Sequence, residues 1–293
     1  MLDLQNVTKT FGNVKALDDL TMTVPRGAVY GLVGPNGAGK STAIRCLLGV
    51  YRPDCGTVTL DGAPVYENPL AKARIGSIPD DIFYFPSATM EDMRKFYQGI
   101  YPKFDQALYY KLFEAFDLPK KAPLRRFSKG MQKQAAFHLT LCTRPEVLVL
   151  DEPVDGLDPV MRRQVWSLIL SEVAKEETTV LISSHNLREL EDICDHVGIM
   201  DHGRMLLQRS LADMQGATHK LQLVGNIPEG LEILHQNQSG RLTTLIVRGK
   251  AEDIAAKARA AQCVYFDVLP LSLEEIFIYE LGGVNYEVKN IVL

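Results

Sequence analysis

One eight-residue segment constrains the fold more than any other part of the chain. It matches the pattern GxxxxGK[ST] and reads Gly34, Pro35, Asn36, Gly37, Ala38, Gly39, Lys40, Ser41. It lies between a strand expected at 29–33 and a helix expected at 40–48. Glycines let backbone N–H groups turn inward around phosphates, the lysine adds a positive charge, and the serine hydroxyl can bind Mg²⁺. The segment therefore predicts a phosphate-binding loop whose helix directs its positive end at the same anion.

Short apolar runs alternate with helical patterns through the first 215 residues. Helical spacing extends from Met90 to about Thr143 and again from Val160 to Val173. Apolar strands joined by helical crossovers predict a parallel sheet that is covered on both faces, and hence an α/β fold. The strands expected besides 29–33 are 2–7, 20–24, 57–60, 75–78, 147–150 and 179–182.

Two adjacent carboxylates follow the apolar run 147–150. The end of a buried strand places Asp151 at the carboxyl edge of the sheet, beside the phosphate-binding loop. We expect Asp151 and Ser41 to hold Mg²⁺, and Glu152 to orient or deprotonate an attacking water. The alternative is a solvated acidic turn.

At this point residues 1–215 resemble the nucleotide-binding subunit of ABC transporters. The segment 127–131, Phe-Ser-Lys-Gly-Met, is similar to the LSGGQ signature of that family, 155–158 looks like its D-loop, and His185 looks like its switch histidine. The resemblance implies a P-loop NTPase cassette with a RecA-like core sheet, an antiparallel β subdomain and an α-helical subdomain at about 87–143. It implies ATP and Mg²⁺ as cofactors, with Lys40, Glu152 and His185 as catalytic residues. The remaining ATP-binding residues that it implies are the loop residues 34–41 with Thr42, and Phe11, Ser128, Gly130 and Asp158.

The chain departs from the family pattern in two places. Only Ser128 and Gly130 keep their letters in the signature, and Asp80 stands where the family has the glutamine of its Q-loop. A carboxylate can still bind Mg²⁺, so Asp80 is a third candidate metal ligand, or else an exposed loop acid. Phe11 is expected to stack on adenine, with a core or turn aromatic as the alternative.

The resemblance also implies partners. In the family, the signature closes on the γ-phosphate held by the opposite subunit, so we expect a second copy or a paralogous cassette to complete an ATP sandwich. A separate membrane-spanning permease would then hold the protein at the cytoplasmic face of the membrane. The aromatic run Ile82, Phe83, Tyr84, Phe85 is either the surface that receives the permease or a cover over the helical subdomain.

Residues 217–293 change in style and predict a small accessory α+β domain after a cassette of residues 1–216. Strands are expected at 220–224, 242–247 and 264–269, and a helix at 252–261. The segment 271–277 resembles an ending common in exporter-type cassettes, or is a helix that Ser272 caps together with Glu275. Gly282 and Gly283 introduce a tail that we expect to dock elsewhere.

Composition excludes other classes. The net charge of −4 speaks against a nucleic-acid partner, and no run reaches the ~18 apolar residues of a membrane span. The five widely spaced cysteines favour neither disulfides nor zinc, and Cys46, Cys142 and Cys194 are expected in the core.

From the resemblance we expect the ATPase subunit of a bacterial exporter of drugs or amphipathic peptides, similar to those encoded beside GntR-type regulators. The alternatives are an importer ATPase with a regulatory C-terminal domain and a soluble ABC ATPase of translation or repair.

Overall fold

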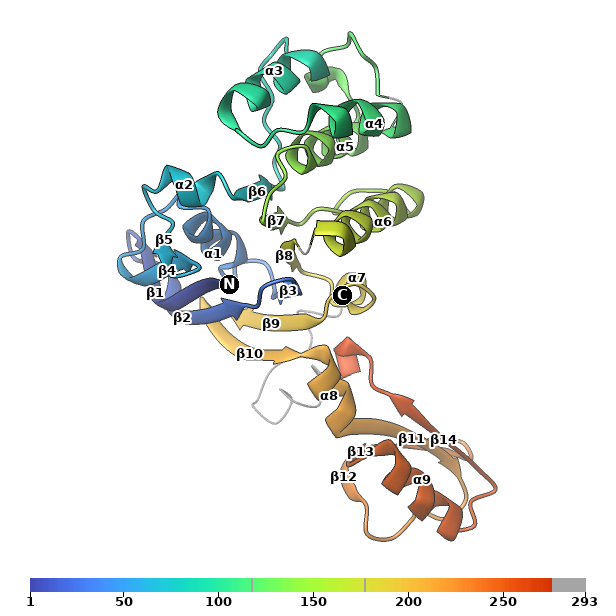
Figure 1. Cartoon of the computed structure of the whole chain (residues 1–293). Coiled ribbons are helices and arrows are strands. Elements are labelled where there is room, and N and C mark those ends of the chain that lie inside the picture. Colours follow the sequence, from blue (N-terminus) through green and yellow to red (C-terminus); the bar gives the residue numbers. More distant parts are fainter. Residues whose placement is uncertain (117, 177, 276–293) are drawn as a thin grey trace. The chain divides into compact units, whose positions relative to one another are not determined.

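The computed structural model describes residues 1–116, 118–176 and 178–275, and its elements are labelled in Figure 1. The chain forms two compact units. The first holds Met1–His185 and Gly198–Gln208, and the second holds Asn186–Val197 and the chain from Arg209 onward. The predicted division into a cassette of residues 1–216 and an accessory domain of residues 217–293 stays a prediction. Across the described residues, no helix is both long and apolar enough to cross a membrane.

A six-stranded sheet forms the centre of the first unit, in the order β10-β9-β3-β8-β7-β6. The pairs β3–β8, β8–β7 and β7–β6 are parallel, which confirms the predicted parallel sheet. Every residue of β3, β7 and β8 is buried, as strands covered on both faces require. Strands β9 and β10 were not predicted from the sequence. The strands are β3 (Val29–Val33), β6 (Ile75–Ile78), β7 (Val147–Asp151), β8 (Thr179–Ser184), β9 (His196–Asp201) and β10 (Arg204–Ser210).

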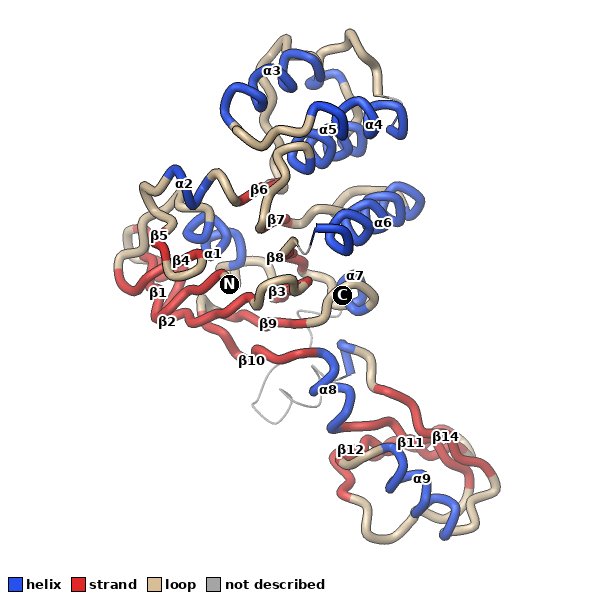
Figure 2. The backbone as a smooth tube through the Cα atoms, viewed as in Figure 1, coloured by secondary structure: helices blue, strands red, loops and turns tan. Residues whose placement is uncertain are grey.

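A four-stranded antiparallel sheet in the order β2-β1-β4-β5 accompanies this parallel sheet, as Figure 2 shows. Its first two strands are longer than predicted, because polar residues continue the ladder until Phe11 pairs with Val14 across a tight turn. Gly12 adopts a φ of 58° in that turn, a conformation that glycine tolerates without strain. The strands are β1 (Leu2–Phe11), β2 (Val14–Val24), β4 (Cys55–Leu60) and β5 (Ala63–Pro64).

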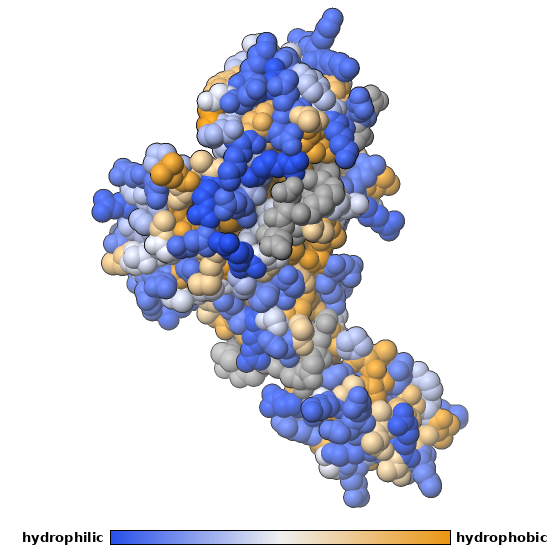
Figure 3. All heavy atoms as spheres, viewed as in Figure 1, coloured by the Kyte–Doolittle hydropathy of each residue, from blue (hydrophilic) through white to orange (hydrophobic). Residues whose placement is uncertain are grey.

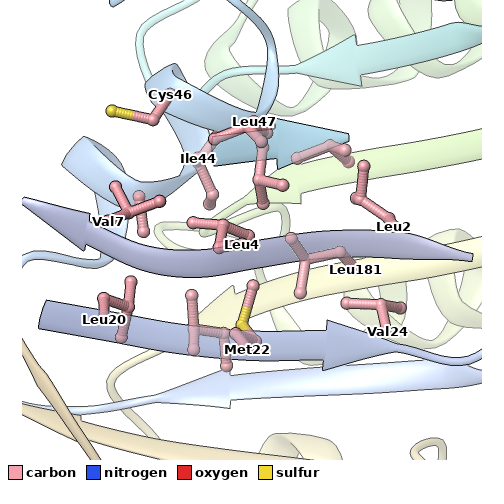
Figure 4. Close-up of a cluster of buried hydrophobic side chains, with 14 of the residues drawn as sticks. Leu2, Leu4, Val7, Leu20, Met22, Val24, Ile44, Cys46, Leu47 and Leu181 are labelled. Carbon is pink, nitrogen blue, oxygen red and sulfur yellow. The ribbon is translucent and has the colours of Figure 1, made fainter. Parts of the chain in front are cut away.

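One apolar cluster joins both sheets to helix α1 (Lys40–Leu47). Figure 4 shows Leu4 and Met22 from the antiparallel sheet near Ile44 and Leu47 of α1, with Leu181 of β8 beside them. These side chains are at most 3% exposed. Burial of a leucine side chain is worth about 2 kcal/mol, so this core holds the start of α1 firmly behind the phosphate-binding loop.

The helical part of the first unit lies between β6 and β7 in the sequence, as predicted. Thr89 and Asp92 form a capping box at the start of α3. Helix α5 contacts α3, α4, α6 and β6 and buries nine consecutive residues. The helices of the first unit beyond α1 are α2 (Pro69–Lys72), α3 (Met90–Ile100), α4 (Gln106–Phe116), the 3₁₀ turn η1 (Leu124–Arg126), α5 (Lys129–Leu141) and α6 (Pro159–Glu176).

The second unit contains an antiparallel sheet in the order β12-β13-β11-β14. Its apolar cluster joins the sheet to α9, which confirms the predicted mixture of strands and a helix. Strand β12 was not predicted, because all eight of its residues are exposed and carry no apolar alternation. The elements are α7 (Arg188–Glu191), α8 (Leu211–Ala217), β11 (Thr218–Val224), β12 (Glu232–Ser239), β13 (Leu242–Arg248), α9 (Ala251–Ala260) and β14 (Tyr265–Pro270).

Ser272 and Glu275 form the predicted cap. The Glu275 N–H donates to Ser272 Oγ at 3.2 Å, and the Ser272 N–H donates to Glu275 Oε2 at 3.0 Å. Residues 276 and 277 of the exporter-like ending, and the tail with Gly282 and Gly283, lie outside the described residues.

Cys46, Cys142 and Cys194 are buried, which confirms that they lie in the core. Burial raises the pKa of the Cys46 thiol to about 11, so this side chain behaves as a small apolar group.

Candidate functional site

The phosphate-binding loop runs from the end of β3 to the start of α1 and needs its glycines for two reasons. Gly37 and Gly39 have φ values of 86° and 101°, in the left-handed region that suits glycine. A Cβ atom on Gly34 would lie 2.3 Å from the Met200 carbonyl oxygen, and one on Gly39 would lie 2.6 Å from the Ala16 carbonyl oxygen. The loop conformation thus depends on residues that have no side chain.

Lys40 is the first residue of α1, and it is 7% exposed. Its Nζ donates to the Gly34 carbonyl oxygen at 2.6 Å and lies 3.6 Å from Glu152 Oε1. Burial lowers the pKa of Lys40, and the nearby Glu152 and Asp151 oppose that shift. The Lys40 side chain thus links the end of the phosphate-binding loop to its beginning and places a positive charge inside the loop.

Asp151 ends β7 with its carboxylate buried against hydroxyl groups. Its Oδ1 accepts a hydrogen bond from Ser183 Oγ at 2.5 Å and lies 3.4 Å from Ser41 Oγ. Hydroxyl and carboxylate oxygens beside a phosphate-binding loop are the hard ligands that Mg²⁺ takes, with phosphate oxygens and waters completing its shell. Ser41 and Asp151 therefore fit the predicted metal. Ser183 was not among the predicted site residues.

Glu152 has a backbone φ of 47°, which is uncommon for a residue with a side chain. Its N–H donates to Ser183 Oγ at 3.0 Å, and its Oε2 lies 3.0 Å from Nδ1 of the half-exposed His185. Burial raises the pKa of Glu152, while Lys40 and His185 counter that shift. A carboxylate of this kind, held between the Lys40 ammonium group and the His185 ring, can orient a water and accept its proton.

Lys40, Ser41 and Glu152 open into a pocket of about 450 Å³. Ten predicted residues line it, as do five that were not foreseen: Val14, Lys15, Ala16, His202 and Gly203. The unforeseen residues come from the start of β2 and the turn after β9, two elements whose extent the sequence did not reveal. The predicted residues in the lining are Pro35, Asn36, Gly37, Ala38, Gly39, Lys40, Ser41, Thr42, Asp80 and Glu152.

Four predicted nucleotide-binding residues lie elsewhere in the first unit. Phe11 packs edge-to-face on Tyr51, with ring centroids 5.2 Å apart. Ser128 caps α5 by accepting the Met131 N–H at 3.3 Å, and Gly130 lies in the first turn of that helix. Asp158 caps α6 by accepting the N–H groups of Val160 and Met161, each at 3.0 Å. Their roles toward ATP stay predictions.

Asp80 follows β6 and lines the pocket, with a half-exposed side chain. Desolvation raises its pKa, whereas the ammonium group of Lys133, 3.8 Å from its Oδ1, lowers it. Lys133 was not among the predicted site residues. The role of Asp80 as a metal ligand stays a prediction.

Comparisons with known proteins agree with this geometry. The ABC transporter family model matches residues 17–155. YtrB, an ABC transporter ATP-binding protein of Bacillus subtilis (strain 168), is 30% identical over 288 residues, which cover 97% of this chain and 99% of YtrB. The Nod factor export ATP-binding protein I of Burkholderia lata is 32% identical over 296 residues, covering 96% and 97% of the two chains. A solved structure of the ATP-binding subunit of an ABC transporter matches 73% of this chain and 92% of its own, with a TM-score of 0.67 and 26% identity.

The fold and the pocket together define a P-loop ATPase with the architecture of an ABC cassette. The chain belongs to the ABC transporter family and is an ATP-binding subunit that hydrolyses ATP.

Proposed function

We propose that the chain is the motor subunit of a two-component exporter. The observation that carries this proposal is the pocket that Lys40, Ser41 and Glu152 line at the phosphate-binding loop. Asp151 lies 3.4 Å from Ser41 Oγ, and His185 lies 3.0 Å from Glu152 Oε2. The Burkholderia lata relative is named for export, and it aligns with this chain over nearly its whole length. Both facts favour an ATPase that drives transport outward from the cytoplasmic face of the membrane.

Two copies, or one copy and a paralogous cassette, would enclose ATP between one phosphate-binding loop and the other signature. The cap of α5 supports this idea, because Ser128 holds the first turn of a helix whose N-terminal N–H groups can face an anion. Closure on ATP and opening after hydrolysis would then convert binding free energy into movement of the permease.

Glu152→Gln tests this mechanism. The variant keeps the shape of the side chain but cannot accept a proton, so ATP binding should persist while turnover falls roughly 100-fold or more. With ATP and Mg²⁺, light scattering should report a stable dimer. Glu114→Gln, on the exposed face of α4, is the matched control and should behave as the wild type does. A monomeric Glu152→Gln protein at saturating ATP would contradict the sandwich.

The permease would dock on the aromatic run and the neighbouring helix α3. Phe83, Phe85 and Phe96 are 70%, 47% and 45% exposed and stack edge-to-face in series. Tyr84 instead is buried, and its hydroxyl donates to the Gln132 carbonyl oxygen at 2.8 Å. The predicted run is thus divided between surface and core. In the space-filling view the surface is largely hydrophilic, with apolar atoms in small groups (Figure 3).

Phe83→Ala/Phe85→Ala tests this surface. Loss of two exposed anchors should weaken co-purification with the proposed permease by roughly 10-fold or more, with ATP binding unchanged. Tyr110→Ala, which removes an aromatic ring that is 51% exposed on α4, is the control. Undiminished assembly of the double variant would exclude the proposed surface.

For the cargo we propose a drug or an amphipathic peptide, as in exporters encoded beside GntR-type regulators. The support is the similarity of Pro79-Asp80-Asp81 and of the segment 127–131 to those exporters. Cells that carry the chain and its permease should tolerate such compounds better than cells that carry Glu152→Gln. Faster accumulation of a solute in wild-type cells would favour an importer instead.

A further inference from the structure

Helix α5 carries one buried lysine beneath the loop that follows β7. Lys133 is 6% exposed, and its Nζ donates to the carbonyl oxygens of Glu152 and Asp155 at 2.8 and 2.9 Å. An ammonium group has three donors and is costly to bury without partners. Two of its donors hold a single loop of four residues. The Lys133 side chain therefore binds the backbone of the loop 152–155, and its ammonium group does not extend into solvent.

The loop needs to be held, because Glu152 sits in a conformation that side chains rarely adopt. Its φ of 47° is left-handed, and such residues persist where their surroundings determine them. Ser183 Oγ accepts the Glu152 N–H at 3.0 Å, and Lys133 Nζ donates to the Glu152 carbonyl oxygen. Both peptide groups that flank the Glu152 Cα are thus bonded to side chains. From this backbone, the carboxylate reaches both Lys40 and His185.

Asp80 faces the same ammonium group on the pocket side. Its Oδ1 lies 3.8 Å from Lys133 Nζ, within ion-pair distance. Asp80 stands where the family has a neutral glutamine, so the chain has one extra negative charge near Asp151 and Glu152. Lys133 supplies the opposite charge at that place.

We propose that Lys133 is a positioning residue for ATP hydrolysis, which holds Glu152 in its left-handed conformation and balances the charge of Asp80. Since Lys133 lies five residues after Ser128 on the same helix, it also ties the signature of this subunit to its own water-orienting carboxylate. The proposal rests on the role proposed above for Glu152. It adds that a residue of α5 holds Glu152 in the position that this role requires.

Steady-state ATP hydrolysis by the full chain tests the proposal with Lys133→Met, which keeps most of the unbranched side chain but has no donor. We expect kcat to fall about 30-fold, with the KM for ATP within about 3-fold of the wild-type value, because the phosphate-binding loop itself is untouched. Lys111→Met, at an exposed site on α4, is the matched control and should leave both parameters unchanged.

A second variant separates positioning from a general loss of folding. Asp80→Asn/Lys133→Met removes both charges, so it should recover about 5-fold in kcat over Lys133→Met while the backbone hydrogen bonds remain lost. Lys133→Gln, which can still donate to one carbonyl group, should lie between Lys133→Met and the wild type. Melting temperatures and binding of a non-hydrolysable ATP analogue are measured for each variant.

Two results would overturn the proposal: a kcat of Lys133→Met within about 3-fold of the wild type, or no recovery in the double variant together with a parallel loss of ATP binding. Glu152→Gln is measured alongside. If that variant keeps its turnover, the proposed function fails. If it is inactive while Lys133→Met remains fully active, only the assignment of Lys133 fails.

Discussion

Around the phosphate-binding loop, charged side chains are buried and bonded, whereas in the sheet β11–β14 every charged side chain is at least partly exposed. Lys40, Lys133 and Asp151 are all less than 9% exposed. Among the described residues of the second unit, the buried polar side chains are two threonines, Thr218 and Thr243. Because a buried charge costs free energy unless it is paired, a region that buries several charges is a candidate for a chemical role. The contrast separates the region of the predicted site from a sheet whose core is apolar.

The largest effect is expected where the buried charge meets substrate. Lys40→Ala removes the ammonium group from the loop, so ATP affinity should fall roughly 100-fold, or about 3 kcal/mol, as charge-assisted bonds to phosphate are lost. Calorimetric titration with ATP measures this. Lys111→Ala is the surface control on α4. If Lys40→Ala bound ATP as tightly as the wild type does, the buried charge at the loop would have no role in binding ATP.

The second unit should respond through its core alone. Leu245 is fully buried in the apolar cluster of β11, β13 and α9, so Leu245→Ala should destabilise this unit by roughly 3 kcal/mol. Hydrogen exchange of β13 and thermal unfolding report the change. Leu234→Ala, at a 39% exposed site on β12, should cost less than ~1 kcal/mol. A drop in ATP affinity in either variant would show that the regions are coupled.

His138 gives an intermediate effect that depends on pH. It is completely buried on α5, its Nε2 lies 2.7 Å from the Tyr109 carbonyl oxygen, and burial lowers its pKa to about 4. Since the unfolded chain takes up a proton near pH 6.5, this histidine makes stability fall as pH drops below that value, by about 2 kcal/mol at pH 5.

His138→Leu should remove that part of the pH dependence. Urea unfolding at pH 7 and pH 5 measures the difference between variant and wild type. His235→Asn, on exposed β12, serves as the control and should leave the slope between the two pH values nearly unchanged. Parallel pH profiles for His138→Leu and the wild type would contradict the assignment.

The smallest effect is expected from charges at the surface of the second unit. Arg248 and Glu232 are 3.1 Å apart but half or more exposed, so solvent screens their attraction. Glu232→Gln should change the free energy of unfolding by less than ~0.5 kcal/mol, and 1 M salt should abolish the change. A loss above ~1 kcal/mol would mean that this edge strand contributes more than its exposure suggests.

The features that could be predicted from the sequence are those that a short local pattern of residues marks. The loop at 34–41, the apolar strands β3, β6, β7 and β8, and the carboxylates after β7 all follow from patterns of a few residues. Strand β12 escaped prediction because an edge strand that faces water on both sides has no hydrophobic period. The same holds for the polar extension of β1 and β2, which only pairing with a neighbour reveals.

The site could be predicted as far as its motifs extend. Lys133 and Ser183 were missed because each acts on the backbone of Glu152, a contact that depends on how α5 and β8 pass beside the loop. No residue type marks such a contact in advance. A charged residue in the buried stretch of a helix was the one available signal, since nine consecutive residues of α5 are buried and Lys133 is the first of them.

Lys40 already donates to the Gly34 carbonyl oxygen, an acceptor that belongs to the loop itself. Because an ammonium group has three donors, a phosphate oxygen can use the others or compete with this carbonyl oxygen for the same one. Such competition discriminates among anions. A weakly basic, singly charged anion such as chloride gains little over the carbonyl oxygen, whereas a polyphosphate chain gains several bonds at once.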